Sequence, residues 1–562
     1  MCNIKMVNLK TDILIIGGGT AGCYAGITAK EQNERKEVLI VEKGNIKRSG
    51  CLAGGIDSIN AYLNPGQTPE KFLEYVKQDS EGLVREDLVY TIAQNLNKVV
   101  HKLEKWGVPF LKDDNGNYKT KGPRSIKING ERIKPIIAQK TKEAGVDILN
   151  RVVITNYIVD NNKVIGAFGF SVNEKKFYII HSKAVICATG GASGIYKPNN
   201  PETIPHRMWY PPFNTGAGYA MGIRSGAEMT TFEMRFIALR TKDTIAPTGT
   251  LVQDFGAKQV NNNKKEYQRD YEKNSTPFRL YATNKENLLG NGPCFLDLTH
   301  LKAEIDYDLK KSYLNMAPSI VLKWVDQETI PSNDKIEIEG TEPYIVGGHA
   351  QAGYWINKKR ETTLDGLYAA GDVAGGAPKK YASGCMVEGK IAAINALKHI
   401  KNVEFRSLND EVIDQEINRV FKPLNKTNGI QINKLENRLQ EIMDEYAGGI
   451  SEDYKLIENK LIQARKLLKK LHTNVFKASV DSLHELMSYH EILDRVYVAR
   501  VLVEHLIYRK ETRWRGYQER VDYPNKDDDN WMKFVNSVYD YKNDEINMHT
   551  RNLIKVGELN DN

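Results

Sequence analysis

The sequence predicts an α/β protein with a split nucleotide-binding domain, an inserted capping domain and a helical C-terminal domain. A glycine-rich turn follows a short apolar, β-rich run near the N-terminus, at residues 11–16. Several β-rich runs follow between residues 152 and 188, and residues 455–509 are nearly free of Gly and Pro. We therefore expect a Rossmann-type domain at residues 1–239 and 344–409, a capping domain at 240–343 and a helical domain at 410–562.

Length and composition are those of an ordinary globular protein. The 562 residues allow two or three domains, and 41% of them are hydrophobic and 27% charged. The net charge is 79 − 71 = +8, and aromatic residues are not interleaved with basic clusters, so nucleic acid is not an expected partner. The N-terminus lacks an apolar signal core, and no apolar stretch reaches about 18 residues. We expect a cytoplasmic protein without membrane insertion.

The six cysteines are scattered along the chain, and none of them forms a CxxC pair. Iron–sulfur clusters and disulfide frameworks normally use closely or regularly spaced cysteines. We therefore expect no metal site and no cluster in this chain, and we interpret the cysteines as small buried hydrophobic residues. They are Cys2, Cys23, Cys51, Cys187, Cys294 and Cys385.

Glycines 17, 19 and 22 have the G-x-G-x-x-G spacing of a dinucleotide-binding turn. Gly17 would allow the tight turn, Gly19 the approach of a pyrophosphate, and Gly22 close packing of helix on strand. Glu42 ends the second predicted strand at the offset of a ribose-binding acid. The cofactor-binding residues assigned here are Gly17, Gly19, Thr20, Ala21, Gly22, Glu42 and Lys43.

Three further segments favour FAD over NAD as the dinucleotide. Ala188 to Gly191 follow an apolar strand, residues 366–372 end in Gly-Asp, and residues 48–55 form a loop of small residues. These segments predict a Rossmann-type FAD-binding domain with an inserted α+β capping domain and a C-terminal helical domain. Their assigned cofactor-binding residues are Ser49, Gly50, Ala53, Gly54, Gly55, Ala188, Thr189, Gly190, Gly371, Asp372 and Ser383.

Local patterns predict further elements inside the first domain. Residues 68–106 have helical periodicity. Four strands are predicted after residue 151, and Asn161-Asn162 is the expected turn between the first two. The predicted strands are residues 152–158, 163–171, 176–180 and 184–188.

Over nearly its full length the chain resembles the fumarate reductase/succinate dehydrogenase flavoprotein superfamily. The four flavin segments occur in family order, and Thr512 to Gly516 with Asp522 to Pro524 is similar to the terminal region of that superfamily. The small-residue loop lacks the His that attaches FAD in succinate and fumarate enzymes, so we expect non-covalent FAD. The chain also lacks the dicarboxylate-binding Arg that the resemblance would place near residues 380–384.

Several short segments, in a shared order, narrow the resemblance within the superfamily. They are residues 48–50 with 58–62, 84–90, 209–211 with 214–216, 233–236 with 240–243, 292–293, 347–349 and 381–384 with 388–393. In these segments the chain most resembles the adenylylsulfate reductase alpha subunit. This resemblance implies reduction of adenylylsulfate to sulfite and AMP through a flavin N5 adduct, with electrons from a ferredoxin-like iron–sulfur beta subunit.

Five residues are candidates for the catalytic chemistry. Arg240 and Arg235 could hold a sulfate and a leaving phosphate, because charge builds on oxygen atoms in a dry site and guanidinium matches such anions. His349 could donate a hydrogen bond, as the family His does, while Trp209 could stack on flavin or adenine and Asn60 could contact either ligand. The alternative for each is a structural role, in an ion pair or in the core.

Two other functions stay open at this point. The chain could be another flavin reductase that acts on fumarate or a different small acid through a different Arg. It could also be a substrate-free FAD protein for electron transfer or redox sensing. Turnover of the substrate, and a substrate-linked change in flavin absorbance, would distinguish them.

Overall fold

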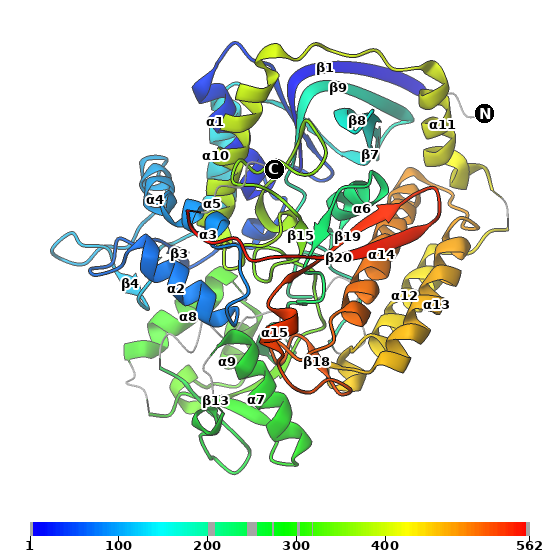
Figure 1. Cartoon of the computed structure of the whole chain (residues 1–562). Coiled ribbons are helices and arrows are strands. Elements are labelled where there is room, and N and C mark those ends of the chain that lie inside the picture. Colours follow the sequence, from blue (N-terminus) through cyan, green and yellow to red (C-terminus); the bar gives the residue numbers. More distant parts are fainter. Residues whose placement is uncertain are drawn as a thin grey trace.

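The core of the chain is a seven-stranded sheet. The computed structural model describes residues 4–200, 208–243, 256–271, 275–300, 304–316, 318–426 and 428–557. Figure 1 shows the sheet at the top of the molecule, with β1 and β9 long and curved. The strand order is β6-β2-β1-β9-β8-β7, and β16 also pairs with β9. Its strands are β1 (Lys5–Ile16), β2 (Val38–Glu42), β6 (Asp147–Asn150), β7 (Val152–Asp160), β8 (Lys163–Ser171), β9 (Lys176–Cys187) and β16 (Leu367–Ala369).

The sheet follows the predicted Rossmann-type pattern, with β1 parallel to β2 and to β9. Residues 13–16 of β1 are buried, as their unbroken apolar run indicates. The predicted turn at Asn161-Asn162 is confirmed: both residues have positive φ, 49° and 63°, and join β7 to β8. β9 is one strand where the sequence predicted two, because the polar residues His181 and Ser182 between the two predicted strands also pair with β1.

Two helices next to this sheet are in close contact with each other. α1 (Thr20–Gln32) and α10 (Tyr381–His399) pack against each other, as Figure 1 shows. A Cβ atom at Gly389 would lie 2.2 Å from the Ala21 carbonyl oxygen, so this crossing requires glycine. The contact joins the first and the last flavin segments of the sequence.

The predicted helical region at residues 68–106 forms three helices. They are α2 (Pro69–Asp79), α3 (Glu86–Ala93) and α4 (Leu96–Lys105). A small antiparallel sheet lies beyond them, in the order β3 (Ser58–Asn60), β5 (Ser125–Lys127) and β4 (Thr120–Lys121), and α5 (Ile133–Glu143) follows it.

The inserted unit is a four-stranded antiparallel sheet with helices, at the lower left of Figure 1. Its strand order is β11-β14-β13-β12, and its first strand starts at Leu239. The elements are β11 (Leu239–Thr241), β12 (Lys258–Val260), α7 (Thr276–Leu288), β13 (Cys294–Asp297), α8 (Glu304–Met316), α9 (Ser319–Asp326) and β14 (Lys335–Gly340). The predicted α/β fold with an α+β insertion and a C-terminal helical part is confirmed. The domain boundaries stay a prediction.

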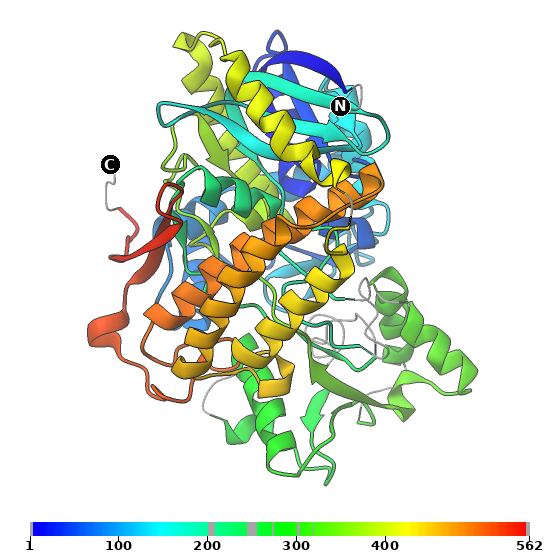
Figure 2. The same ribbon diagram turned by 90° about the vertical axis from the view of Figure 1, so that its right-hand side faces the viewer.

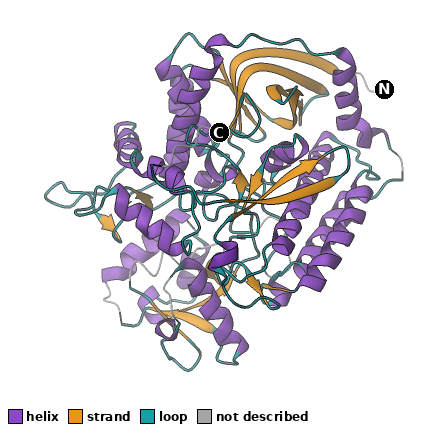
Figure 3. Cartoon of the chain, viewed as in Figure 1, coloured by secondary structure: helices purple, strands orange, loops and turns teal. Residues whose placement is uncertain are grey.

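The C-terminal part begins with α11 (Asp410–Phe421). Three helices that run alongside one another follow it (Figure 2): α12 (Ile432–Tyr446), α13 (Glu458–Val475) and α14 (Leu483–Tyr508). The sequence missed a hairpin after them, β19 (Phe534–Asp540) with β20 (Glu545–Arg551), which Figure 3 shows in orange. β19 pairs with β10 (Met229–Thr230), which in turn pairs with β15 (Gly353–Tyr354). This partner is about 300 residues away, so no local pattern could indicate it.

The remaining short elements are α6 (Ala217–Arg224), β17 (Lys455–Leu456), β18 (Glu519–Arg520) and α15 (Asp528–Trp531). Among the described residues, no helix combines the length and the apolar character that crossing a membrane requires.

Candidate functional site

The three motif glycines meet different surroundings. Gly17 has φ +102°, and a Cβ atom there would lie 2.5 Å from the Ala188 carbonyl oxygen. A Cβ at Gly22 would lie 1.9 Å from the Gly17 carbonyl oxygen. Among the described residues, apart from the two chain neighbours, a Cβ at Gly19 would meet no atom within 4 Å. Gly17 and Gly22 are therefore required by the protein itself, whereas Gly19 faces open space that a ligand can approach.

The N-terminus of α1 faces this open space. α1 begins at Thr20, its N-cap is Gly19, and neither a capping side chain nor an acidic residue occupies the first turn. The first amide groups of Thr20, Ala21 and Gly22 are thus available to an anion. This geometry fits the pyrophosphate of FAD.

Glu42 supports the glycine turn from the second strand. Its Oε2 accepts a hydrogen bond from the Gly18 amide at 2.7 Å, and its Oε1 accepts one from the Gly44 amide at 2.7 Å. Each carboxylate oxygen has a second acceptor position, so a ribose hydroxyl can still be bound. Ser49 also contacts the turn, because its hydroxyl donates to the Gly18 carbonyl oxygen at 3.2 Å. The small-residue loop with Gly50, Ala53, Gly54 and Gly55 therefore starts beside Gly19.

The second flavin segment is held from several sides at Asp372. The hydroxyl of Tyr210 donates to Asp372 Oδ2 at 2.8 Å, and the hydroxyl of Tyr219 donates to the Asp372 carbonyl oxygen at 2.6 Å. The Gly371 amide donates to Glu388 Oε2 at 2.9 Å. Asp372 thus has a fixed position near α1 and α10, where it can meet the ribityl and pyrophosphate part of FAD.

The other predicted cofactor residues differ in their surroundings, and not all of them face the flavin segments. Ala188 and Thr189 follow β9 beside Gly17, and Gly190 has φ +79°. Ser383 is fully buried in α10, and its hydroxyl has no hydrogen-bond partner among the described residues. Lys43 differs: its ammonium donates to the Phe213 carbonyl oxygen and to Glu491 Oε1 of α14, both at 2.6 Å. This arrangement favours an interdomain role for Lys43 over the predicted cofactor role.

Sequence reasoning missed a lysine that braces the glycine turn. Lys134 of α5 is fully buried, and its ammonium donates to the Gly18 carbonyl oxygen at 2.8 Å and to the carbonyl oxygen of Ile46. Lys134 is far from the glycine motif in the sequence, so only the packing of α5 against the turn shows this role.

An aromatic cluster lies next to the second flavin segment, and two predicted catalytic residues belong to it. The His349 ring centroid is 5.1 Å from that of Trp209, 4.7 Å from that of Phe236 and 5.4 Å from that of Tyr381. The ring centroid of Tyr344 lies 5.8 Å from that of Trp209. We call Trp209, Phe236, Tyr344, His349 and Tyr381 the aromatic cluster.

His349 is held as a neutral imidazole. Burial, together with the charge of Lys379, lowers its pKa to about 4, although the charge of Asp372 acts in the opposite direction. Its Nδ1 has no hydrogen-bond partner among the described residues. A buried polar nitrogen without a partner is costly, so this atom is suited to a hydrogen bond with a ligand.

Arg240 and Asn60 belong to two other elements of the chain, β11 and β3. Arg240 is buried on β11, and its Nη2 donates to Glu339 Oε1 at 2.8 Å and to the carbonyl oxygen of Asn199. Asn60 ends β3, and its Oδ1 accepts a hydrogen bond from the Ser125 hydroxyl at 2.9 Å. The catalytic roles of both residues stay predictions.

The structure favours a structural role for Arg235 over the predicted catalytic one. Its guanidinium is fully buried and donates to carbonyl oxygens of Tyr517 at 3.0 Å, Ala447 at 2.9 Å and Tyr454 at 3.0 Å. All three acceptors belong to the C-terminal part of the chain. Arg235 therefore anchors its neighbour Phe236, and through it the aromatic cluster, to the C-terminal part.

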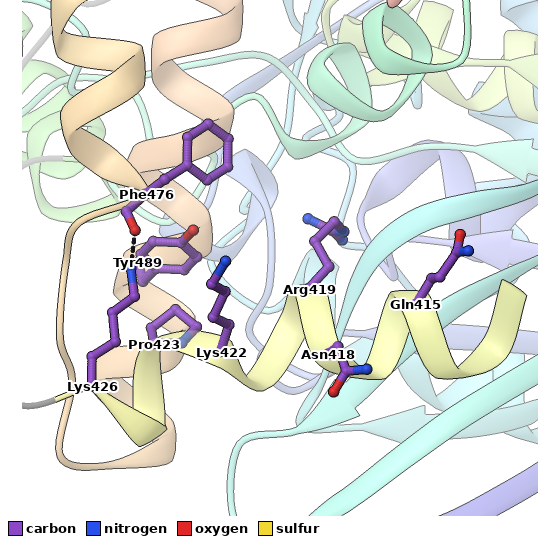
Figure 4. A pocket seen from close by; sticks show the side chains of 8 residues that line it. All are labelled: Gln415, Asn418, Arg419, Lys422, Pro423, Lys426, Phe476 and Tyr489. Atoms are coloured by element: carbon purple, nitrogen blue, oxygen red, sulfur yellow. Dashed lines mark hydrogen bonds between the residues drawn. The ribbon is translucent and has the colours of Figure 1, made fainter. Parts of the chain in front are cut away.

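A surface pocket of about 290 Å³ lies elsewhere, between the end of α11 and the helices α13 and α14 (Figure 4). Two of its cations bind other groups of the chain: Arg419 pairs with Glu416, and Lys426 donates to the Phe476 carbonyl oxygen. It contains none of the predicted site residues. Its lining residues are Gln415, Asn418, Arg419, Lys422, Pro423, Lys426, Phe476 and Tyr489.

Comparison with known families agrees with this geometry. Residues 12–386 match the family described as FAD binding domain, and residues 436–557 match that described as fumarate reductase flavoprotein C-term. The chain belongs to the FAD-binding flavoprotein family. The predicted superfamily and the predicted cofactor are thereby confirmed.

Several relatives of this flavoprotein are similar over almost their whole length. The adenylylsulfate reductase subunit alpha of Megalodesulfovibrio gigas is 28% identical, with 95% of this chain and 94% of the relative covered. The structure of adenylylsulfate reductase from Archaeoglobus fulgidus is 35% identical, has a TM-score of 0.95 and covers 99% and 98% of the two chains. A structure of adenosine-5-phosphosulfate reductase in complex with sulfite, described as a covalent adduct, has a TM-score of 0.94 with the same identity and coverage.

We expect this flavoprotein to release its FAD on denaturation. Residues 48–55, which precede β3, contain no His, and Gly50 stands beside Gly19 instead. Acid precipitation should therefore leave yellow flavin in the supernatant. Flavin that stays with the polypeptide on a denaturing gel, with a matching mass increase, would contradict non-covalent binding.

Proposed function

We propose that this flavoprotein is the alpha subunit of an adenylylsulfate reductase, which reduces adenylylsulfate to sulfite and AMP. The observation that carries the proposal is the similarity over 99% of the chain to a reductase structure with bound sulfite. The aromatic cluster with neutral His349 beside the second flavin segment supports it.

The site residues suit such a reaction. Bound FAD in its reduced form would supply the electron pair that sulfur accepts. The bond between sulfur and the bridging oxygen then breaks, and AMP leaves with that oxygen. Arg240 would offset the negative charge that develops on the anion, and His349 would donate a hydrogen bond from its neutral ring. The rings of Trp209 and Phe236 would exclude water from this contact.

A dicarboxylate substrate is less well supported by the structure. The residue nearest the expected substrate-binding Arg is Lys380, which is fully buried. Its ammonium donates to the Gly371 carbonyl oxygen at 2.9 Å and the Ala374 carbonyl oxygen at 2.6 Å, and it lies 3.1 Å from Glu388 Oε2. This lysine supports the flavin segment and offers no charge to a small acid.

The electrons would come from a partner protein. We propose a ferredoxin-like iron–sulfur beta subunit, because the similar relative is an alpha subunit and the cysteines of this chain are scattered. No group of three or more His, Cys, Asp or Glu residues with metal-binding geometry is found among the described residues. Analysis of iron and acid-labile sulfide in the isolated chain checks this arrangement, and stoichiometric iron would contradict it.

The proposed function predicts an AMP-dependent reaction in reverse. Adding sulfite and AMP to the oxidised protein with its iron–sulfur partner should reduce an electron acceptor, because sulfite oxidation requires AMP as the acceptor of sulfur. Sulfite with adenosine is the matched control and should give no sustained turnover. Rates that are independent of AMP, or reduction of fumarate by the reduced protein, would contradict the proposal.

A further inference from the structure

We propose that Arg124 binds the phosphate group of the nucleotide in this site. The inference rests on the proposed function and adds a residue of the nucleotide-binding domain that the sequence did not single out. Three features carry it: the position of Arg124 beside Asn60, the unengaged state of its guanidinium, and its proximity to the aromatic cluster.

Arg124 lies at the border between the nucleotide-binding domain and the cap. It stands directly before β5, where its carbonyl oxygen accepts a hydrogen bond from the Ala61 amide at 2.9 Å. In the same register Asn60 pairs with Ser125. At the other end of β5, the Lys127 ammonium lies 3.3 Å from Asp308 Oδ2 of the cap helix α8. The small sheet thus presents Arg124 beside a predicted site residue and close to the cap.

The Arg124 guanidinium is stacked and otherwise unengaged. Its central carbon lies 3.5 Å from the ring centroid of Tyr75. Within the ranges that the structure describes, the half-buried guanidinium forms no hydrogen bond and no ion pair. Stacking on an aromatic ring leaves the N–H edges of the planar group exposed, and these edges match a phosphate in a two-point contact.

Three contacts, joined by neighbouring positions of the chain, connect Arg124 with the aromatic cluster. Tyr75 lies one turn before Asp79 on α2, and Asp79 Oδ2 is 2.7 Å from the Lys379 ammonium. Two residues later, Tyr381 contacts His349. The charges of Lys379 and Arg124 both act on the Tyr381 hydroxyl, where they lower a pKa that burial raises.

A second polar group that lacks a hydrogen-bond partner among the described residues, the Tyr62 hydroxyl, lies near Arg124. Tyr62 is 8% exposed, and its hydroxyl has no hydrogen-bond partner among the described residues. The charge of Arg124 lowers the pKa of this hydroxyl, while burial raises it. A buried hydroxyl that lacks a partner beside an unengaged guanidinium is the polar environment that an oxyanion would complete.

The phosphate is the part of the substrate that Arg124 would contact. The sulfur must react next to the flavin, where His349 and Trp209 lie. Arg124 stacks on Tyr75 of α2 beside the small sheet, and from that side its charge acts on Tyr381, which contacts His349. A guanidinium there would meet the nucleotide phosphate and keep the leaving group charge-balanced as the bond to sulfur breaks.

The test compares AMP with adenosine in the FAD-loaded protein. Titration calorimetry should show that Arg124→Gln weakens AMP binding on the order of 10- to 100-fold, the range for one charge-assisted hydrogen-bonded contact. Adenosine binding should be unchanged, and Arg124→Lys should restore AMP binding only in part. Arg132→Gln, on an exposed arginine before α5, is the matched control and should bind AMP like the wild type.

Flavin content and melting temperature show that each variant is folded. AMP affinity retained in Arg124→Gln, or an equal loss for adenosine and AMP, would overturn the role of Arg124 while the proposed function stands. A wild-type protein that does not bind AMP would overturn the proposed function, and the assignment of Arg124 with it.

Discussion

Replacing Gly19 by valine should give a folded protein that no longer retains FAD. Gly19 has an extended backbone, with φ −73° and ψ −161°, which valine adopts without strain. In the described part of the chain, the two neighbouring residues aside, no atom lies within 4 Å of a Cβ atom at this position, so the expected clash is with the cofactor. Overpacking of this kind costs about 1–3 kcal/mol or more, so FAD affinity should fall about 100-fold.

The neighbouring Gly22 provides the matched contrast. A Cβ atom there would lie 1.9 Å from the Gly17 carbonyl oxygen, so Gly22→Ala should lower the thermal stability of the apoprotein itself. For Gly19→Val we expect an unchanged melting temperature of the apoprotein and loss of flavin absorbance after desalting. Normal flavin occupancy in Gly19→Val would mean that the pyrophosphate does not approach this turn.

Removing the His349 or the Arg240 side chain should lower kcat on the order of 100-fold while FAD stays bound. This loss is typical of a donor or charge that acts mainly in the transition state. Burial holds the pKa of His349 at about 4, so its ring is neutral at pH 7 and donates without being a charged acid. Wild-type kcat should therefore show no titration of His349 between pH 6 and 8. Steady-state rates with adenylylsulfate, together with flavin content, measure these effects.

The controls separate catalysis from packing. His484→Ala changes an exposed histidine of α14 and should keep wild-type rates. Glu339→Gln removes the ion-pair partner of Arg240 at 2.8 Å but keeps the guanidinium, so its rate should fall far less than that of Arg240→Ala. Arg240→Lys should rescue only in part, because ammonium lacks the planar fork. Equal losses in Glu339→Gln and Arg240→Ala would instead mean that Arg240 is a structural ion-pair residue.

The turn that holds the flavin could be predicted from the amino-acid sequence alone. The spacing of Gly17, Gly19 and Gly22 and the turn at Asn161-Asn162 reflect local backbone conformations. A backbone conformation of this kind depends on residues that are close together in the sequence, so it can be predicted from one sequence. Glu42 could be recognised by its position at the end of the second strand, although its hydrogen bond to the Gly18 amide joins two different elements.

Tertiary packing determines which polar side chains form hydrogen bonds or ion pairs within the protein and which can still bind a ligand. Arg235 and Arg240 share a segment of the sequence, yet the first binds carbonyl oxygens of the C-terminal part and the second lies at the base of the cap. Lys43 follows Glu42 but pairs with Glu491, and the hairpin of β19 and β20 pairs with β10. These partners lie hundreds of residues away, and a long side chain binds whichever groups packing brings within reach. Arg124 has no motif around it, and only the approach of α2 and the small sheet shows that its charge is still available.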